Sequence, residues 1–77
     1  MNKTIRKRIN KLMEGLQSIR DEIEMIADEE QEKFDNLPEG IQATERGEAL
    51  ETAAESLQSG IESIDEAIEY FQEAIAY

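Results

Sequence analysis

Residues 35–44 of this 77-residue chain read Asp35-Asn36-Leu37-Pro38-Glu39-Gly40-Ile41-Gln42-Ala43-Thr44, and they decide the fold because they interrupt a helical pattern. Pro38 cannot continue a helix and disfavours helical geometry at Leu37. Thr44 is a good N-cap residue for the segment that follows. We therefore predict a helix over about 3–35, a hinge over about 36–43 with a short helical turn after Pro38, and a second helix over about 44–76.

Apolar residues on both sides of the hinge recur at alternating steps of three and four, the period of a helix that buries one stripe. The first stripe comprises Ile5, Ile9, Leu12, Leu16, Ile19, Ile23 and Ile26, and the second comprises Ala54, Leu57, Ile61, Ile64, Ile68, Phe71 and Ile75. A chain reversal near Gly40 brings the stripes into register, from Ile26 paired with Ala54 to Ile5 paired with Ile75. The predicted fold is all-α, an antiparallel and coiled-coil-like two-helix hairpin.

A row of small residues runs beside the second stripe. It consists of Ala53, Gly60, Ala67 and Ala74, and Gly15 of the first helix faces the same side. Two interpretations stay open: tight packing inside the hairpin, or a flat face for another hairpin in a dimeric four-helix bundle. A chain of this length is close to the lower limit for a self-sufficient core, which makes further burial plausible.

The composition disfavours most enzyme classes. The chain has no cysteine and no histidine, which removes thiol chemistry, the usual zinc and haem ligands and the side chain best suited to proton transfer near neutral pH. We expect a non-enzymatic protein without cofactor or metal. Since the apolar residues never form a continuous run, we also expect no membrane span and a cytoplasmic location.

The net charge of −11 arises from 8 Lys and Arg against 19 Asp and Glu, unevenly distributed. A basic cluster near the N-terminus is expected to lie beside acidic residues at the end of the second helix and to offset their charge. The basic residues are Lys3, Arg6, Lys7, Arg8 and Lys11, and the acidic ones are Glu66, Glu69 and Glu73. From Gly47 onward the chain has eight carboxylates and no Lys or Arg, which is the main functional clue.

The candidate partner-binding face is acidic. Its centre is an acidic row, Glu48, Glu55, Glu62 and Glu69, with a spacing of about 10.5 Å along the helix. The full face comprises Glu48, Glu55, Glu62, Glu66, Glu69, Glu73, Asp21, Glu24, Asp28 and Glu32. Such a field imitates a nucleic-acid backbone and suits the basic groove of a DNA- or RNA-binding protein. The competing explanation is that acidity only keeps a small protein soluble.

The hinge region resembles small acidic helical proteins encoded by bacteriophages and mobile elements of Gram-positive bacteria. The residues that carry the resemblance are 28–42, DEEQEKFDNLPEGIQ, followed by 45–48, ERGE, and the likeness extends over roughly residues 20–75. Small acidic phage proteins are often inhibitors of host defence, including anti-CRISPR proteins that imitate DNA. The resemblance therefore implies a basic channel or an arginine-rich motif reader of a CRISPR nuclease as partner.

Two functional hypotheses follow from these patterns. The first is a non-enzymatic inhibitor that binds a nucleic-acid-handling protein of a bacterial host through its carboxylates, without binding nucleic acid itself. The second is a structural oligomerisation module, in which the small-residue face forms a homodimer. Salt dependence separates them, because charge-driven binding weakens as salt rises and apolar association does not.

Overall fold

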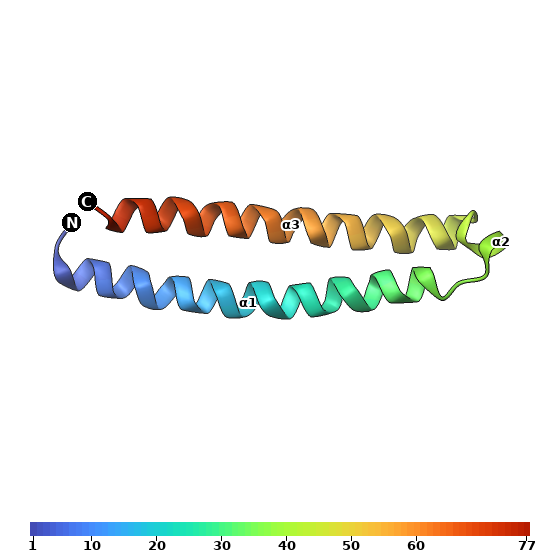
Figure 1. Cartoon of the computed structure of the whole chain (residues 1–77), viewed down its shortest axis with the longest axis horizontal. Coiled ribbons are helices and arrows are strands. Elements are labelled where there is room, and N and C mark those ends of the chain that lie inside the picture. The colour runs from blue at the N-terminus through green and yellow to red at the C-terminus, as the bar shows by residue number, and fades with distance from the viewer.

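A computed structural model of residues 1–77 contains three helices, α1 (Lys3–Asp35), α2 (Glu39–Gln42) and α3 (Glu45–Ile75). The long helices α1 and α3 lie side by side and antiparallel, in a hairpin 58 Å long whose two termini meet at the end opposite α2 (Figure 1). This confirms the predicted all-α hairpin, with long-helix bounds within one residue of the prediction. Neither long helix is apolar enough over a sufficient length to cross a membrane.

Each long helix begins at a polar residue in extended conformation. Asn2 precedes α1, and its Oδ1 accepts a hydrogen bond from the backbone N–H of Ile5 at 2.9 Å, which satisfies one of the free donors of the first turn. Thr44 precedes α3, as predicted, but its hydroxyl donates to the carbonyl of Ile41 at 2.5 Å and caps no N–H of α3. The hydroxyl of Thr44 therefore stabilises the end of α2.

The hinge is organised around Gln42 and Gly47. The Gln42 side chain turns back to the end of α1, where its Nε2 donates to the carbonyl of Phe34 at 3.1 Å and, just beyond the helix, to that of Leu37 at 3.2 Å. Gly47 is buried in the first turns of α3 against the backbone of Gln42. A Cβ atom at position 47 would lie 2.6 Å from the Cα and the carbonyl carbon of Gln42, and closer still to its oxygen. The absence of a side chain at Gly47 thus permits the close approach of α2 and α3.

Replacement of Gln42 by alanine is expected to destabilise the hairpin by about 1–2 kcal/mol, because the carbonyl of Leu37 loses its side-chain donor and the carbonyl of Phe34 keeps only the backbone N–H of Leu37. Urea unfolding followed by circular dichroism measures this loss. Gln58→Ala is the matched control, since Gln58 is exposed and its side chain forms no hydrogen bond to the rest of the protein. Equal stability of the two variants would contradict the role given to Gln42.

The seam between the long helices differs from the predicted pairing. The buried residues of α1 are Met13 and Ala27, and those of α3 are Gly47, Ala54, Ile61 and Ile68. The predicted pairing of positions along the two helix axes is correct to within one residue. Ala27 lines the same depression as Ala54, and Met13 lines the same depression as Ile68. The prediction of which side of α1 faces α3 was wrong. The residues predicted to oppose α3 are exposed: Ile5 by 40%, Leu12 by 69%, Ile19 by 52% and Ile26 by 49%.

The physical reason is that the apolar stripe of α1 is wider than the seam. It contains two seven-residue rows, an inner row of Ile9, Leu16 and Ile23 that is half-buried, and an outer row of Ile5, Leu12, Ile19 and Ile26 that is exposed. The side of α1 that contacts α3 also carries Arg6, Met13, Arg20 and Ala27, which are all half-buried or buried. Arg20 of this side binds Asp65 of α3, and Arg6 binds the backbone carbonyl of Tyr77. The outer row of α1 faces away from α3.

Candidate protein-interaction surfaces

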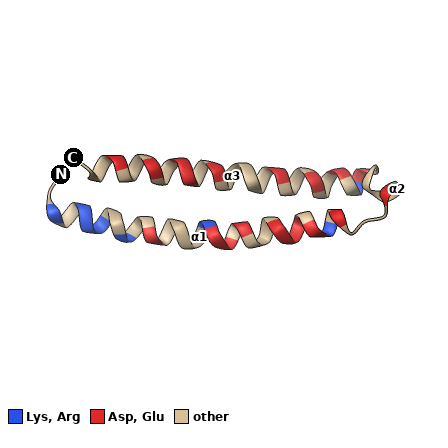
Figure 2. Ribbon diagram, viewed as in Figure 1, with Lys and Arg blue, Asp and Glu red and all other residues tan.

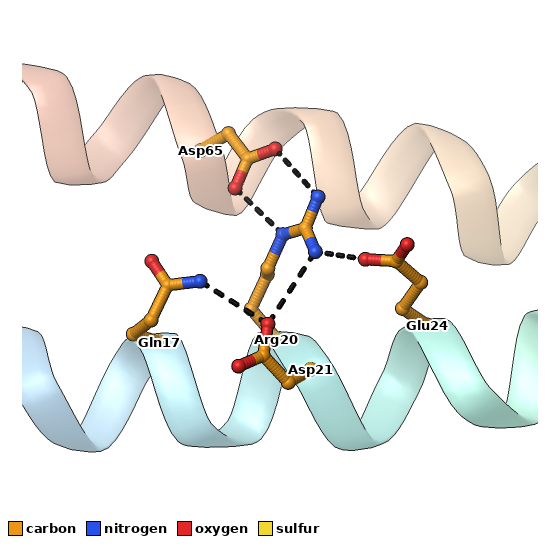
Figure 3. A network of polar contacts seen from close by, with 5 residues as sticks. All are labelled: Gln17, Arg20, Asp21, Glu24 and Asp65. Carbon is orange, nitrogen blue, oxygen red and sulfur yellow. Dashed lines mark hydrogen bonds and ion pairs between the residues drawn. The ribbon is translucent and has the colours of Figure 1, made fainter.

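Arg20 forms the only ion pair that joins the two long helices (Figure 3). Its Nε and Nη2 donate to the two carboxylate oxygens of Asp65 at 2.8 and 3.1 Å, a bidentate arrangement. Its Nη1 donates to Glu24 and, at 3.4 Å, to Asp21. The hydrogen bond with Asp65 is the main cause that raises the pKa of Arg20 above its usual value. The network joins α1 to α3. It also leaves Arg20, the basic residue in the middle of α1, already paired with acidic side chains.

The polar face of the hairpin carries acidic residues from both helices. Asp28 of α1 and Glu55 of α3 line one depression over the seam, and Asp21 and Glu24 join Asp65 through Arg20 on the same side. The remaining members of the acidic row, Glu48, Glu62 and Glu69, are whole heptads from Glu55 and lie on the same side of α3. The acidic row is exposed, whereas Glu24 is half-buried. The structure therefore brings most of the predicted acidic residues together on one face.

Three predicted members of the acidic face lie elsewhere. Glu66 and Glu73 are exposed on the side of α3 that points away from α1, and Glu32 has the corresponding position on α1. The acidic residues extend along α3 and the later part of α1, while most basic residues of α1 gather near the two termini, with Arg20 and Lys33 as the exceptions (Figure 2).

The basic N-terminal segment does not pair with the acidic end of α3 as expected. The two ends are adjacent (Figure 2), but no ion pair joins Lys3, Arg6, Lys7, Arg8 or Lys11 to Glu66, Glu69 or Glu73. Instead, Arg6 donates through Nη2 to the backbone carbonyl of Tyr77, and its Nε is buried without an acceptor. The contact between the two ends thus uses a backbone acceptor, and the predicted charge pairs are absent.

The opposite face of the hairpin is apolar. Ile9, Leu12 and Leu16 of α1 line a depression with Phe71 of α3, and every residue of its lining is hydrophobic. The outer row of α1 continues this face along the helix, and Phe71 itself is 43% exposed. Only six of the 77 residues are buried, and Ile61 is the only large side chain that is completely enclosed. A large part of the apolar surface therefore remains open on one side.

The small-residue row lies on this apolar face. Ala67 and Ala74 flank Phe71 on the surface of α3, at spacings of four and three, and Ala53 and Gly60 continue the row. Ala53, Gly60 and Ala74 are exposed and Ala67 is half-buried. A Cβ atom at Gly60 or at Gly15 would meet no atom within 4 Å. Tight packing inside the hairpin therefore does not explain these small residues.

The hairpin tip presents a depression lined by Lys33, Asn36, Leu37, Arg46, Ala49 and Leu50. Lys33 is paired with Glu30 at 2.9 Å, and this hydrogen bond raises the pKa of Lys33. Arg46, which has Glu45 and Glu48 as neighbours in the sequence, is exposed and forms no ion pair within the chain. No three His, Cys, Asp or Glu side chains come close enough together to hold a metal ion.

The side chains that sequence reasoning missed are those of the seam and the hinge. Arg20 and Arg6 share a heptad position with Met13 and Ala27, and this spacing was the available signal. The contacts of Gln42 carry no periodic signal. Comparison with family models, curated proteins and solved structures finds no match to this chain.

Proposed function

We propose that this chain is a non-enzymatic inhibitor that binds a basic, nucleic-acid-handling protein of a bacterial host through its acidic face. The carboxylates of the acidic row and of Asp21 and Asp28 take the place of nucleic-acid phosphates in the partner's groove. The chain itself binds neither nucleic acid nor membranes and acts in the cytoplasm. The resemblance of its hinge to small acidic phage proteins makes a CRISPR nuclease one candidate partner.

The observation that carries this proposal is the separation of the two faces. Carboxylates from two antiparallel helices share one side of a rod 58 Å long, and the apolar side chains gather on the other. The Arg20 network supports it further, because the cation nearest to the acidic face is already bound to Asp65, Glu24 and Asp21. A fixed and predominantly acidic field accelerates capture of a basic partner and is sensitive to salt.

A second candidate function is that of a helical oligomerisation module. The exposed outer row of α1 favours it, since four large apolar side chains at regular spacing are unusual on the surface of a chain with −11 net charge. The two functions use different faces, so one does not exclude the other.

The proposal is tested by capture from a bacterial lysate on the immobilised chain at low salt, with elution by a salt gradient. We expect a nucleic-acid-binding protein to be released at moderate salt and to be displaced by duplex DNA or RNA. Binding of such a partner should show a steep, linear fall of the logarithm of the affinity with the logarithm of the salt concentration. Retention that is unaffected by high salt or by nucleic acid would refute charge mimicry.

A double variant, Glu55→Gln with Glu62→Gln, is expected to weaken binding to the captured partner about tenfold at low salt, because two carboxylates at the centre of the acidic row lose their charge. The matched control is Glu22→Gln with Glu29→Gln, which removes the same charge from exposed positions on another side of α1. Isothermal titration calorimetry measures both affinities. Equal weakening by the two pairs would mean that net charge, and not the acidic face, governs binding.

A further inference from the structure

We infer that the apolar face is covered by a second copy of this chain, with the two hairpins related by a twofold axis along their length and their α2 ends together. In this arrangement, the outer row of α1 from one copy lies over the small-residue row of α3 from the other. The contact occurs twice, once on each side of the axis, and produces a four-helix bundle with every neighbouring pair of helices antiparallel.

The first observation is the position of the α1 stripe. Its two rows divide between two environments, because the inner row is half-buried against α3 and the outer row is exposed. A helix in a four-helix bundle contacts two neighbours at once and needs a stripe of this width. In the isolated hairpin only one of these neighbours is present, which leaves Leu12 at 69% and Ile19 at 52% exposure.

The second observation is that the face is self-complementary in shape. The outer row of α1 has four large residues, Ile5, Leu12, Ile19 and Ile26, and the small-residue row of α3 has four small ones, Ala74, Ala67, Gly60 and Ala53. Both rows have a spacing of seven, and each large residue lies at about the level of one small residue, because Met13 is level with Ile68 and Ala27 with Ala54. A rotation about the long axis preserves these levels and places large side chains over small ones.

Gly60 is the most informative member of the small-residue row. It interrupts a long helix, where glycine is less favourable than alanine, and nothing in its own chain lies within 4 Å of the position of a Cβ atom. The space over Gly60 is therefore open in one hairpin, at about the level of Ile19 of α1. The side chain of Ile19 from a second copy fits this space in the proposed arrangement.

The outline of the apolar face is large enough for a dimer interface. The hairpin measures 58 by 15 Å in the plane of its two helices (Figure 1), an outline of roughly 870 Å², and a standard interface buries about 800 Å² on each partner. The rim of α3 beside the small-residue row is uncharged, with Ala49, Ser56, Ser63, Tyr70 and Tyr77. Glu22 and Glu29 on the α1 rim of the second copy therefore meet no carboxylate there.

The test is the molecular mass in solution by analytical ultracentrifugation. We expect the wild-type chain to have a mass of 17.6 kDa, twice the 8.8 kDa of one chain, and Gly60→Glu to be monomeric at the same concentration. Ser59→Glu is the control, because it adds the same charge to an exposed site on the side of α3 away from both faces. A wild-type chain that remains monomeric, or a Gly60→Glu variant that remains dimeric, would overturn the inference.

A second experiment tests the twofold arrangement of the two hairpins and does not depend on a destabilised variant. The chain has no cysteine, so Glu39→Cys introduces a single thiol at the exposed start of α2 for a spin label. Pulsed electron spin resonance should give a distance between the two labels below half of the 58 Å hairpin length. A distance near the full length would place the α2 ends apart and refute the twofold axis along the hairpin. Neither experiment involves the acidic face, so its outcome is separate from that of partner capture.

Discussion

Replacement of Ile61 by alanine is expected to lower the free energy of unfolding by about 3 kcal/mol, the largest effect of any single truncation in the chain. Ile61 is the only large side chain with no exposed surface, and it lies in the seam between Ala54 and Ile68. Its truncation leaves a cavity that two rigid helices cannot close by collapse. Urea unfolding monitored by circular dichroism, at a fixed protein concentration, measures the loss.

Met25→Ala is the matched control for this truncation. Met25 is 65% exposed on α1 and belongs neither to the seam nor to the outer apolar row, so its replacement is expected to change stability by less than about 0.5 kcal/mol. If Ile61→Ala were as stable as Met25→Ala, the seam would not lie where the structure places it.

Replacement of Gly47 by alanine is expected to destabilise the hairpin by about 2 kcal/mol, although alanine is the better helix former by about 1 kcal/mol. The reason is steric, since a Cβ at this position overlaps the backbone of Gln42 and no flexible side chain is available to move aside. The hinge would have to open, and Gln42 would lose its hydrogen bonds to the end of α1. The same unfolding measurement detects this effect.

Gly15→Ala is the matched control, and we expect it to stabilise the protein, in contrast to Gly47→Ala. A Cβ atom at Gly15 meets nothing within 4 Å, so alanine should stabilise α1 by up to about 1 kcal/mol through its helix propensity alone. A stabilising Gly47→Ala would show that Gly47 has no role in the close approach of α2 and α3.

The helices and the hinge could be predicted because their signals are local. Pro38, the interruption of the helical pattern around it and the polar residue Thr44 predict where the helices end and begin, to within one residue for the long helices. The pairing of positions along the two antiparallel helices could be predicted from where the two apolar stripes lie in the sequence. The contacts of the hinge could not be predicted, because the hydrogen bonds of Gln42 and the close approach at Gly47 depend on how three helices meet in space.

The seam shows the limit of periodicity more clearly. Heptad spacing identified the apolar stripe of α1 but not the half of it that contacts α3, since adjacent rows have the same period. Arg20 lies on the side of α1 that contacts α3, where it forms a bidentate pair with Asp65. A seam assigned by hydrophobicity alone excludes arginine, and it therefore placed Ile19 and Leu12 where Arg20 and Met13 lie.

The acidic face was predictable in composition and only partly in position. The heptad row of Glu48, Glu55, Glu62 and Glu69 required only the helical period, and it is exposed as expected. Glu66, Glu73 and Glu32 were grouped with it because sequence proximity cannot separate neighbouring sides of a helix.

The two faces of the hairpin are compatible in one assembly. If two copies cover their apolar faces with each other, their acidic faces point outward on opposite sides of the bundle. The association of the copies then strengthens with salt, because two chains of net charge −11 repel each other less when screened. Binding of a basic partner to either acidic face weakens under the same conditions.

Sedimentation of the wild-type chain at about 0.01 M and about 1 M salt, where the Debye length falls from ~30 to ~3 Å, tests the assignment of the two faces most directly. The predicted result is a dimer of 17.6 kDa, twice the chain mass, whose dissociation constant decreases as salt increases. A monomer at both salt concentrations, or a dimer that high salt dissociates, would contradict the account.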